Sequence, residues 1–267
     1  MGRAWRIEFE GALYHILSRG NEKRDIVSDD SDRRRLRDAI GEAAERFDLD
    51  IFAYVLMNNH YHLLLRTRQA NLSRAMQWFG TPYTQRYNTR HGRSGHLFQG
   101  RFKSIIVEND AYLLRLSLYI HRNPVKARLA LRPEEYPWSS HRLYLGTAPS
   151  WLATGEALGL LAGSRPKARR LFQEFVAGTA SGRYDPEEAR LGAAVGDDDF
   201  VRTALARAGK DDLVQRLLTV ESVVEAVAAR EGVTLAELSG PRRLRSLSRV
   251  RSLCALLGRE VARIPLA

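Results

Sequence analysis

The sequence His60-Tyr61-His62 places two imidazoles two residues apart in a β-favouring run. Residues two apart in a strand lie on one face, so both imidazoles would share a face and Tyr61 would point to the other. Two neutral nitrogens on one strand face can bind a divalent metal ion. The alternative is that His60 and His62 are ordinary polar residues on a half-solvated strand.

The segment Leu118 to Pro124 carries a phenol and an amide at helical spacing. Tyr119 and Asn123 are four residues apart, so on a helix their side chains share a face. Pro124 is typical of a helix that ends there, because a proline disfavours helical geometry in the residue before it. If this helix packs beside the two histidines, the imidazoles and the Asn123 amide would supply three neutral ligands. A metal held by neutral ligands keeps its full charge to polarise a phosphate.

A phenol beside such a metal is a candidate nucleophile. An unperturbed phenol has a pKa of about 10, so it needs a nearby cation or a proton acceptor to attack at neutral pH. Attack by Tyr119 on a phosphodiester would give a phosphotyrosine that retains the bond energy for joining a second DNA end without ATP. Spacing alone leaves Tyr112 open as well, since it lies seven residues earlier, and either tyrosine could be a core aromatic.

Strand patterns surround these residues. Residues 8–19 and 101–107 favour strands, and residues 51–57 and 60–66 favour two strands joined by Asn58-Asn59, a pair that tolerates a tight hairpin turn. The sequence therefore predicts four strands, with the two histidines at the start of the third.

Helical patterns alternate with the strands. The acidic cluster at 29–32 can cap a helix whose apolar residues recur to Phe47. Apolar residues from Leu72 to Tyr87 predict a second helix, which Gly80-Thr81-Pro82 should kink or interrupt. A third helix should run from about residue 111 to 120 or beyond. The element order predicts an α+β fold, a ferredoxin-like βαββαβ sheet with an extra catalytic helix, followed by an all-α C-terminal region.

Composition narrows the class of protein. The 267 residues are 44% hydrophobic, which is ordinary for a globular chain with a buried core. No apolar run is long enough to span a membrane or serve as a signal peptide, so we expect a cytoplasmic protein. The single cysteine, Cys254, excludes an internal disulfide and fits small core filler. A formal charge of +11 favours a polyanionic partner such as nucleic acid, although a generally solvated basic surface is the alternative.

The pattern divides the chain into three parts. Residues 1–150 carry the strands and the chemistry, residues 151–212 form a helical connector with a polar linker at 181–199, and residues 213–267 form a second module. That module has two short helical patterns broken at Glu231-Gly232. Seven arginines stand against one glutamate between Pro241 and Arg263.

Three motifs together resemble a known family. They are Asn59-His60-Tyr61-His62, then Gly100-Arg101-Phe102-Lys103-Ser104, then residues 119–125, YIHRNPV. Their order is similar to that of the single-tyrosine HUH transposases, most closely the REP-associated tyrosine transposases of bacteria, over residues 14–146. The resemblance implies a nuclease domain that acts on single-stranded or hairpin DNA, including repetitive extragenic palindromes, with Mg²⁺ or Mn²⁺ and a 5′-phosphotyrosine linkage.

The resemblance also implies roles for individual residues. His60 and His62 would be metal ligands, Asn123 the third ligand and Tyr119 the nucleophile, which removes Tyr112 from candidacy. Basic residues at positions suited to phosphate contacts, or alternatively only solvated, are Arg19, Arg24, Arg101 and Lys103.

The C-terminal stretch is similar to another family. Residues 223–238 and the arginine-rich segment after them resemble the helix-turn-helix domain of the replication initiator DnaA, which implies binding to duplex DNA. The candidate contacts are Arg242, Arg243, Arg245, Arg249 and Arg251. Val250 replaces the usual proline, and the chain ends before the last base-reading helix of that family would be complete.

Two other functions stay open on the sequence. One is a DNA-binding regulator without catalysis, whose binding would survive loss of the metal. The other is a metal-dependent DNA hydrolase that uses water as its nucleophile. The chain could act as a monomer or as a dimer, because relatives of the transposase domain occur in both forms.

Overall fold

The computed structural model describes residues 6–108, 110–177, 194–196, 198–210, 224–225, 227–239 and 247–254. The chain divides into two compact units, Met1–Val201 and Arg202–Ala267. No helix among the described residues is long and apolar enough to cross a membrane. The division at residues 150 and 212, drawn from the sequence pattern, stays a prediction.

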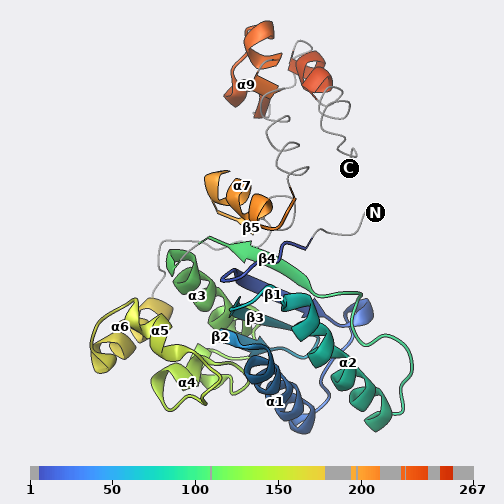
Figure 1. The fold of residues 1–267 in the computed structure, drawn as a ribbon, viewed down its shortest axis with the longest axis vertical. Helices are drawn as coiled ribbons and strands as arrows, with labels where there is room; N and C mark the ends of the chain where they lie inside the picture. Colours follow the sequence, from blue (N-terminus) through green and yellow to red (C-terminus); the bar gives the residue numbers. More distant parts are fainter. Residues whose placement is uncertain are drawn as a thin grey trace. The chain divides into compact units, whose positions relative to one another are not determined.

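One five-stranded sheet organises the first unit, in the order β2-β3-β1-β4-β5 (Figure 1). The strands are β1 Leu13–Arg19, β2 Leu49–Leu56, β3 His60–Thr67, β4 Lys103–Val107 and β5 Ala194–Val195. β1 pairs antiparallel with both β3 and β4, and β3 pairs antiparallel with β2. This order of the first four strands is ferredoxin-like, so the prediction of the fold is confirmed.

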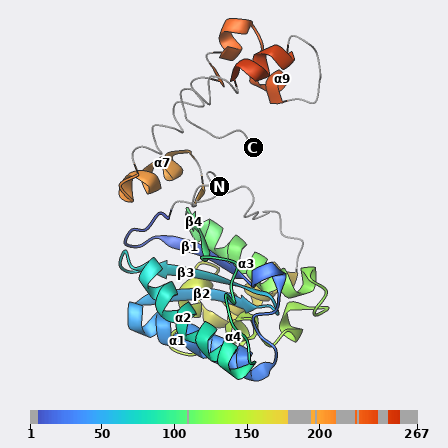
Figure 2. The same ribbon diagram turned by 90° about the vertical axis from the view of Figure 1, so that its right-hand side faces the viewer.

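Helices cover both faces of the sheet (Figure 2). On one face lie α1 Asp30–Phe47 and α2 Leu72–Arg90, and on the other lies α3 Asp110–Lys126. The apolar residues of each helix recur at helical spacing, so burying one stripe against the sheet removes them from water. Tyr61, between the two histidines of β3, contacts Phe79 of α2 with ring centroids 5.6 Å apart. The α2 face of β3 is therefore the face opposite the imidazoles.

Short elements extend the α3 side of the first unit. They are η2 Pro133–Glu135, α4 His141–Leu145, α5 Thr154–Gly159 and α6 Arg165–Ala177. The Ala153 amide donates to the Ile51 carbonyl at 2.8 Å, and Phe172 of α6 is 1% exposed. The segment after residue 150 thus packs on the same core as the sheet.

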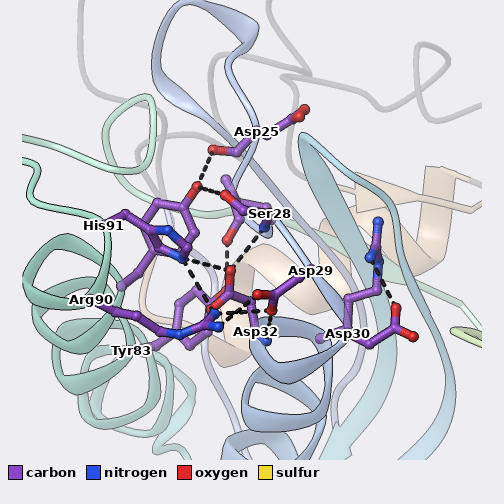
Figure 3. A network of polar contacts seen from close by, with 11 residues as sticks. Asp25, Ser28, Asp29, Asp30, Asp32, Tyr83, Arg90 and His91 are labelled. Atoms are coloured by element: carbon purple, nitrogen blue, oxygen red, sulfur yellow. Dashed lines mark hydrogen bonds and ion pairs between the residues drawn. The ribbon is translucent and has the colours of Figure 1, made fainter.

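A polar network joins the start of α1 to the end of α2 (Figure 3). Asp29 caps α1 by accepting from the Asp32 amide at 3.0 Å, and its carboxylate also accepts from Arg90 at 2.6 Å. His91 lies 2.8 Å from the other carboxylate, that of Asp32, which is 5% exposed. This network fixes the end of α2, where the segment 91–102 begins.

The second unit is helical in its described residues. Residues 227–231 are helical, Gly232 takes a φ of +64° that suits glycine, and α9 spans Leu235–Ser239. Thr234 and Glu237 cap α9 reciprocally, since the Glu237 amide donates to Thr234 and the Thr234 amide donates to Glu237. Residues 247–254 are also helical. In these described residues the prediction of a helical C-terminal region is confirmed, and so is the break at Glu231-Gly232.

Several element boundaries differ from the predictions. α2 runs uninterrupted through Pro82, which is exposed to solvent, so water can reach the carbonyl that loses its helical donor there. α3 passes Pro124 and ends at Lys126. The first strand starts at Leu13, after a turn at residues 10 and 11, instead of at residue 8.

The short strand β5 was not predicted at all. It pairs in parallel with β4 through Ala194 and Val195. Its two residues lie in the stretch that the sequence predicted to be a linker, and two residues give no alternating pattern. The remaining described elements are η1 Asn21–Lys23 and α7 Asp198–Arg207.

Candidate active site

The strand β3 brings the two predicted imidazoles together on the α3 face. The rings of His60 and His62 have centroids 5.1 Å apart and are nearly perpendicular, at 86°. His62 is 4% exposed, whereas His60 is partly exposed at the start of the strand. His62 is therefore buried, whereas solvent or a substrate can reach His60.

A third imidazole, that of His15 on β1, backs His62. The Nε2 of His15 lies 2.8 Å from the Nδ1 of His62, and the two rings are stacked with centroids 5.0 Å apart. His15 has no exposed surface. Because the pair occupies Nδ1 of His62, Nε2 is the nitrogen of that ring that a metal would use.

Burial keeps these imidazoles neutral. It lowers the pKa of His15 to about 3. The pKa of His60 is lowered to about 4, first by burial and then by the charge of Arg19, while a hydrogen bond with Asn123 acts in the opposite direction. The pKa of His62 lies well below its ordinary value because of burial, with smaller contributions from His15 and His60. Neutral imidazoles are the form that ligates a metal.

Asn123 on α3 reaches the imidazole pair directly. Its side chain hydrogen-bonds to His60 and is 9% exposed. On its other side, Nδ1 of His60 donates to the Oδ1 of Asn59 at 2.6 Å. A ring that donates from Nδ1 carries its lone pair on Nε2, which again is the nitrogen for a metal.

Tyr119 lies one turn before Asn123 on the same helix and beside the same rings. Its ring meets that of His62 edge to face, with centroids 5.6 Å apart at 87°. It also lies 5.8 Å from the ring of His15. Tyr112, one of the two tyrosines that spacing alone had allowed, is instead paired with Arg115, whose guanidinium carbon lies 5.6 Å from the Tyr112 ring centre.

The residues present fit the divalent ion that the family resemblance implies. Two neutral imidazoles and one amide oxygen converge from β3 and α3, and oxygen and imidazole donors suit Mg²⁺ or Mn²⁺. Among the described residues no three His, Cys, Asp or Glu side chains form a metal-binding group. The third candidate donor here is Asn123, and asparagine is not one of those four residue types.

The predicted basic contacts of the first unit lie at different distances from this cluster. Arg19 is exposed and pairs in register with His60 across β1 and β3, so its charge stands next to the imidazoles. Arg24 is exposed and pairs with Glu22 at 2.5 Å. Lys103 begins β4 opposite Leu17. Arg101 lines a separate cavity against α2.

Among the predicted contacts of the second unit, Arg249 is exposed. Arg251 donates to the carbonyls of Leu238 at 2.8 Å and Glu237 at 3.0 Å, so its guanidinium caps the C-terminal end of α9. Arg242, Arg243 and Arg245 lie outside the described residues.

Sequence reasoning missed His15 and the contact of Asn59 with His60. His15 stands in the run LYHIL between apolar and aromatic residues, on the same strand face as Leu13 and Leu17. A single buried histidine in a strand is a weak signal, because its partner comes from another strand. The position of Asn59 in the turn was recognised, but its hydrogen bond was not.

Part of this chain is similar to known proteins. Residues 8–123 match the family described as "Transposase IS200 like", and this segment includes His60, His62, Tyr119 and Asn123. A solved structure, "Structure of the REP associates tyrosine transposase bound to a REP hairpin", is similar with 19% identity and a TM-score of 0.47, covering 56% of this chain and 89% of that chain. No curated protein sequence matches this chain.

Proposed function

We propose that this protein is a metal-dependent transposase that cleaves and rejoins single-stranded or hairpin DNA through a 5′-phosphotyrosine on Tyr119. The observation that carries the proposal is the convergence of Tyr119 and Asn123 on His60 and His62: the phenol ring packs against one imidazole and the amide bonds to the other. The family match over residues 8–123 supports a transposase acting on DNA.

Each residue has a distinct role in this proposal. His60, His62 and Asn123 would hold Mg²⁺ or Mn²⁺, and His15 would keep His62 in the tautomer that presents Nε2. When bound, the ion would polarise the scissile phosphate and stabilise the charge that develops on it. Arg19, next to His60, would contact the DNA backbone on the approach to the site.

The reaction divides into two transfers at one phosphorus. In the first, the Tyr119 oxygen attacks phosphorus, the bond to the 3′ oxygen breaks, the phenol proton passes to solvent, and the 3′ oxygen takes up a proton. In the second, the 3′ hydroxyl of another DNA end attacks the phosphotyrosine and Tyr119 leaves as the phenol. Partial burial of Tyr119 would limit attack by water, which would otherwise discard the bond energy.

The test uses labelled hairpin DNA from the repeats that flank the gene, incubated with the protein with and without Mn²⁺ or Mg²⁺. We expect a metal-dependent protein–DNA adduct that survives denaturant and is absent from Tyr119→Phe. Tyr112→Phe is the matched control, and it should form the adduct at the normal rate. Cleavage by Tyr119→Phe without an adduct would favour a hydrolase, and tight binding of DNA without cleavage would favour a regulator.

A further inference from the structure

A cavity lies on the face of the sheet opposite the imidazoles. It measures about 550 Å³ and is bounded by α2, the segment 96–102 and the two central strands. This volume is in the range of pockets that hold small organic groups. Tyr61 lines the cavity, so the strand residue between His60 and His62 connects the two faces.

Aromatic rings form one wall. Phe98 packs edge to face on Tyr61 with ring centroids 6.0 Å apart, and Phe102 also lines the cavity. Tyr61 is 2% exposed and burial raises its pKa, so it presents its ring and not a charge. Flat aromatic surfaces at the rim of a basic protein are the usual platform on which unstacked bases pack.

The opposite wall is a stripe of small and uncharged polar residues on α2. Gln77, Gly80, Thr81, Thr84 and Gln85 recur at helical spacing and line the cavity. Amides and hydroxyls both donate and accept hydrogen bonds, which matches the edges of nucleobases. Gly80 leaves a gap in this wall, because a Cβ placed there would meet nothing within 4 Å.

Two guanidinium groups stand at the edge of the cavity. Arg6 donates to the Ser73 hydroxyl at 2.7 Å and lies over the Phe102 ring, 4.2 Å from its centre. Burial lowers the pKa of Arg6, and the neighbouring positive charge of Arg101 lowers it further. The charge of Glu8 acts in the opposite direction. No Asp or Glu is among the described residues that line the cavity. The Glu8 carboxylate accepts from the amide and the hydroxyl of Ser73 and offsets part of this positive charge. Two like charges held close together still favour a further anion between them.

The cavity is joined to the candidate active site through the backbone. The Gln99 amide donates to the Arg19 carbonyl at 2.8 Å, and Arg19 pairs in register with His60. A single strand that passes the ends of β1 and β3 would therefore meet both the imidazoles and the segment 96–102 within a few nucleotides.

We propose that this cavity holds one unstacked nucleobase of the DNA, stacked on Phe98 and read by the amides of α2, with its phosphate between Arg6 and Arg101. This assignment rests on the proposed action on single-stranded DNA and adds to it a site that selects sequence. Arg101, expected from the sequence to contact phosphate, would do so here and not at the metal.

The test fills the cavity without touching the catalytic cluster. Gly80→Leu places a side chain in the open gap, and Gly159→Leu, at a glycine of α5 that is equally open, is the matched control. Both are made in the Tyr119→Phe protein so that binding is measured without cleavage. The probe is the gene-flanking hairpin with its single-stranded flank, in which each flank base in turn is 5-iodo-deoxyuridine for photocrosslinking.

We expect one flank position to crosslink to a residue within 96–102, the segment that contains Phe98 and Phe102. Gly80→Leu should abolish that crosslink and weaken binding of the flanked hairpin about tenfold, in line with the loss of one stacked base. The bare hairpin and the Gly159→Leu protein should bind as before. Absence of any crosslink within residues 96–102, or equal affinity of the Gly80→Leu and Gly159→Leu proteins, would overturn the assignment.

A second variant guards against misfolding of Gly80→Leu. The exposed pair Gln77→Ala and Gln85→Ala, combined, should reduce the preference among the four bases at the crosslinked position by several-fold, and an unchanged preference would count against the proposal. Adduct formation is measured separately in the protein that retains Tyr119. An adduct without any effect at the cavity would reject only this assignment, whereas a cavity crosslink without an adduct would reject only strand transfer.

Discussion

Two groups of buried histidines lie on the α3 side of the sheet, and they differ in what surrounds them. The first, called here the tyrosine cluster, comprises His15, His60, His62, Tyr119 and Asn123. The second, called the enclosed cluster, comprises His121, Ser140, His141, Tyr144 and Phe172. Tyr119 and His121 are two residues apart on α3, so one helix serves both clusters.

The enclosed cluster differs from the tyrosine cluster in that all of its members are buried. His121 has no exposed surface, its Nε2 lies 2.7 Å from the Ser140 hydroxyl, and its ring meets those of His141, Tyr144 and Phe172. Burial lowers the pKa of His121 well below its ordinary value, as it does for His62. Buried neutral imidazoles alone therefore do not define a reactive site.

The tyrosine cluster combines three features. His60 is partly exposed, the exposed cation Arg19 stands beside it, and a phenol and an amide approach from successive turns of α3. A substrate phosphate can reach such a cluster, whereas the rings around His121 leave it no access. The comparison predicts that changes in the tyrosine cluster alter chemistry and that changes in the enclosed cluster alter stability.

Loss of a ligand should have the largest effect. His60→Ala removes one of the three proposed donors, so we expect adduct formation to fall on the order of a thousandfold and Mn²⁺ binding to weaken strongly. Calorimetric titration of Mn²⁺ and the rate of adduct formation measure the two quantities. Asp29→Ala, which alters a polar network away from the imidazoles, is a control that should bind Mn²⁺ normally. A His60→Ala protein that retains both properties would show that His60 is not a ligand.

Loss of the residue behind a ligand should have a smaller effect. His15→Phe keeps a ring of similar size but removes the partner of His62, so we expect Mn²⁺ affinity to fall about 10- to 100-fold. Titration of the metal without DNA measures this directly, apart from any catalytic step. Unchanged affinity would mean that His15 only fills space.

The same variant should change how the metal-free protein responds to acid. The pKa of His15 falls from an ordinary 6.5 to about 3 on folding, so below about pH 6.5 the unfolded chain takes up a proton that the folded chain does not. As the pH falls from 6.5 to 3, this residue should therefore lower the free energy of unfolding by about 1.4 kcal/mol for each pH unit. Urea unfolding at several pH values should give a shallower slope for His15→Phe. Equal slopes would contradict the assignment.

The smallest effect on chemistry is expected in the enclosed cluster. His121→Phe keeps an aromatic ring and removes the buried Nδ1 of His121, which has no hydrogen-bond partner among the described residues, but it also removes the contact of Nε2 with the Ser140 hydroxyl. We expect the rate of adduct formation to stay within about threefold and stability to change by less than about 1.5 kcal/mol. A loss of adduct comparable to that of His60→Ala would erase the distinction between the two clusters.

Local patterns predicted much of the fold and the site. The two-residue period put His60 and His62 on one face, and the four-residue period put Tyr119 and Asn123 on one helix, because both periods follow from backbone geometry. The sequence did not predict that this helix packs beside the imidazoles; the three-ligand site was conditional on that packing. His15 needed the pairing of β1 with β3, and the cavity against α2 needed residues from three separate segments. Tertiary contacts of this kind leave no local period.

The site of covalent attachment tests the central claim most directly. Trypsin cleaves after Arg115 and Arg122, so residues 116–122 form a peptide with Tyr119 as its one tyrosine, while Tyr112 falls in the preceding peptide. Nuclease and trypsin digestion of the adduct, followed by mass spectrometry, locates the nucleotide. The account predicts a 5′-phosphonucleotide on the peptide 116–122. A nucleotide on the peptide that contains Tyr112, or on any other residue, would contradict it.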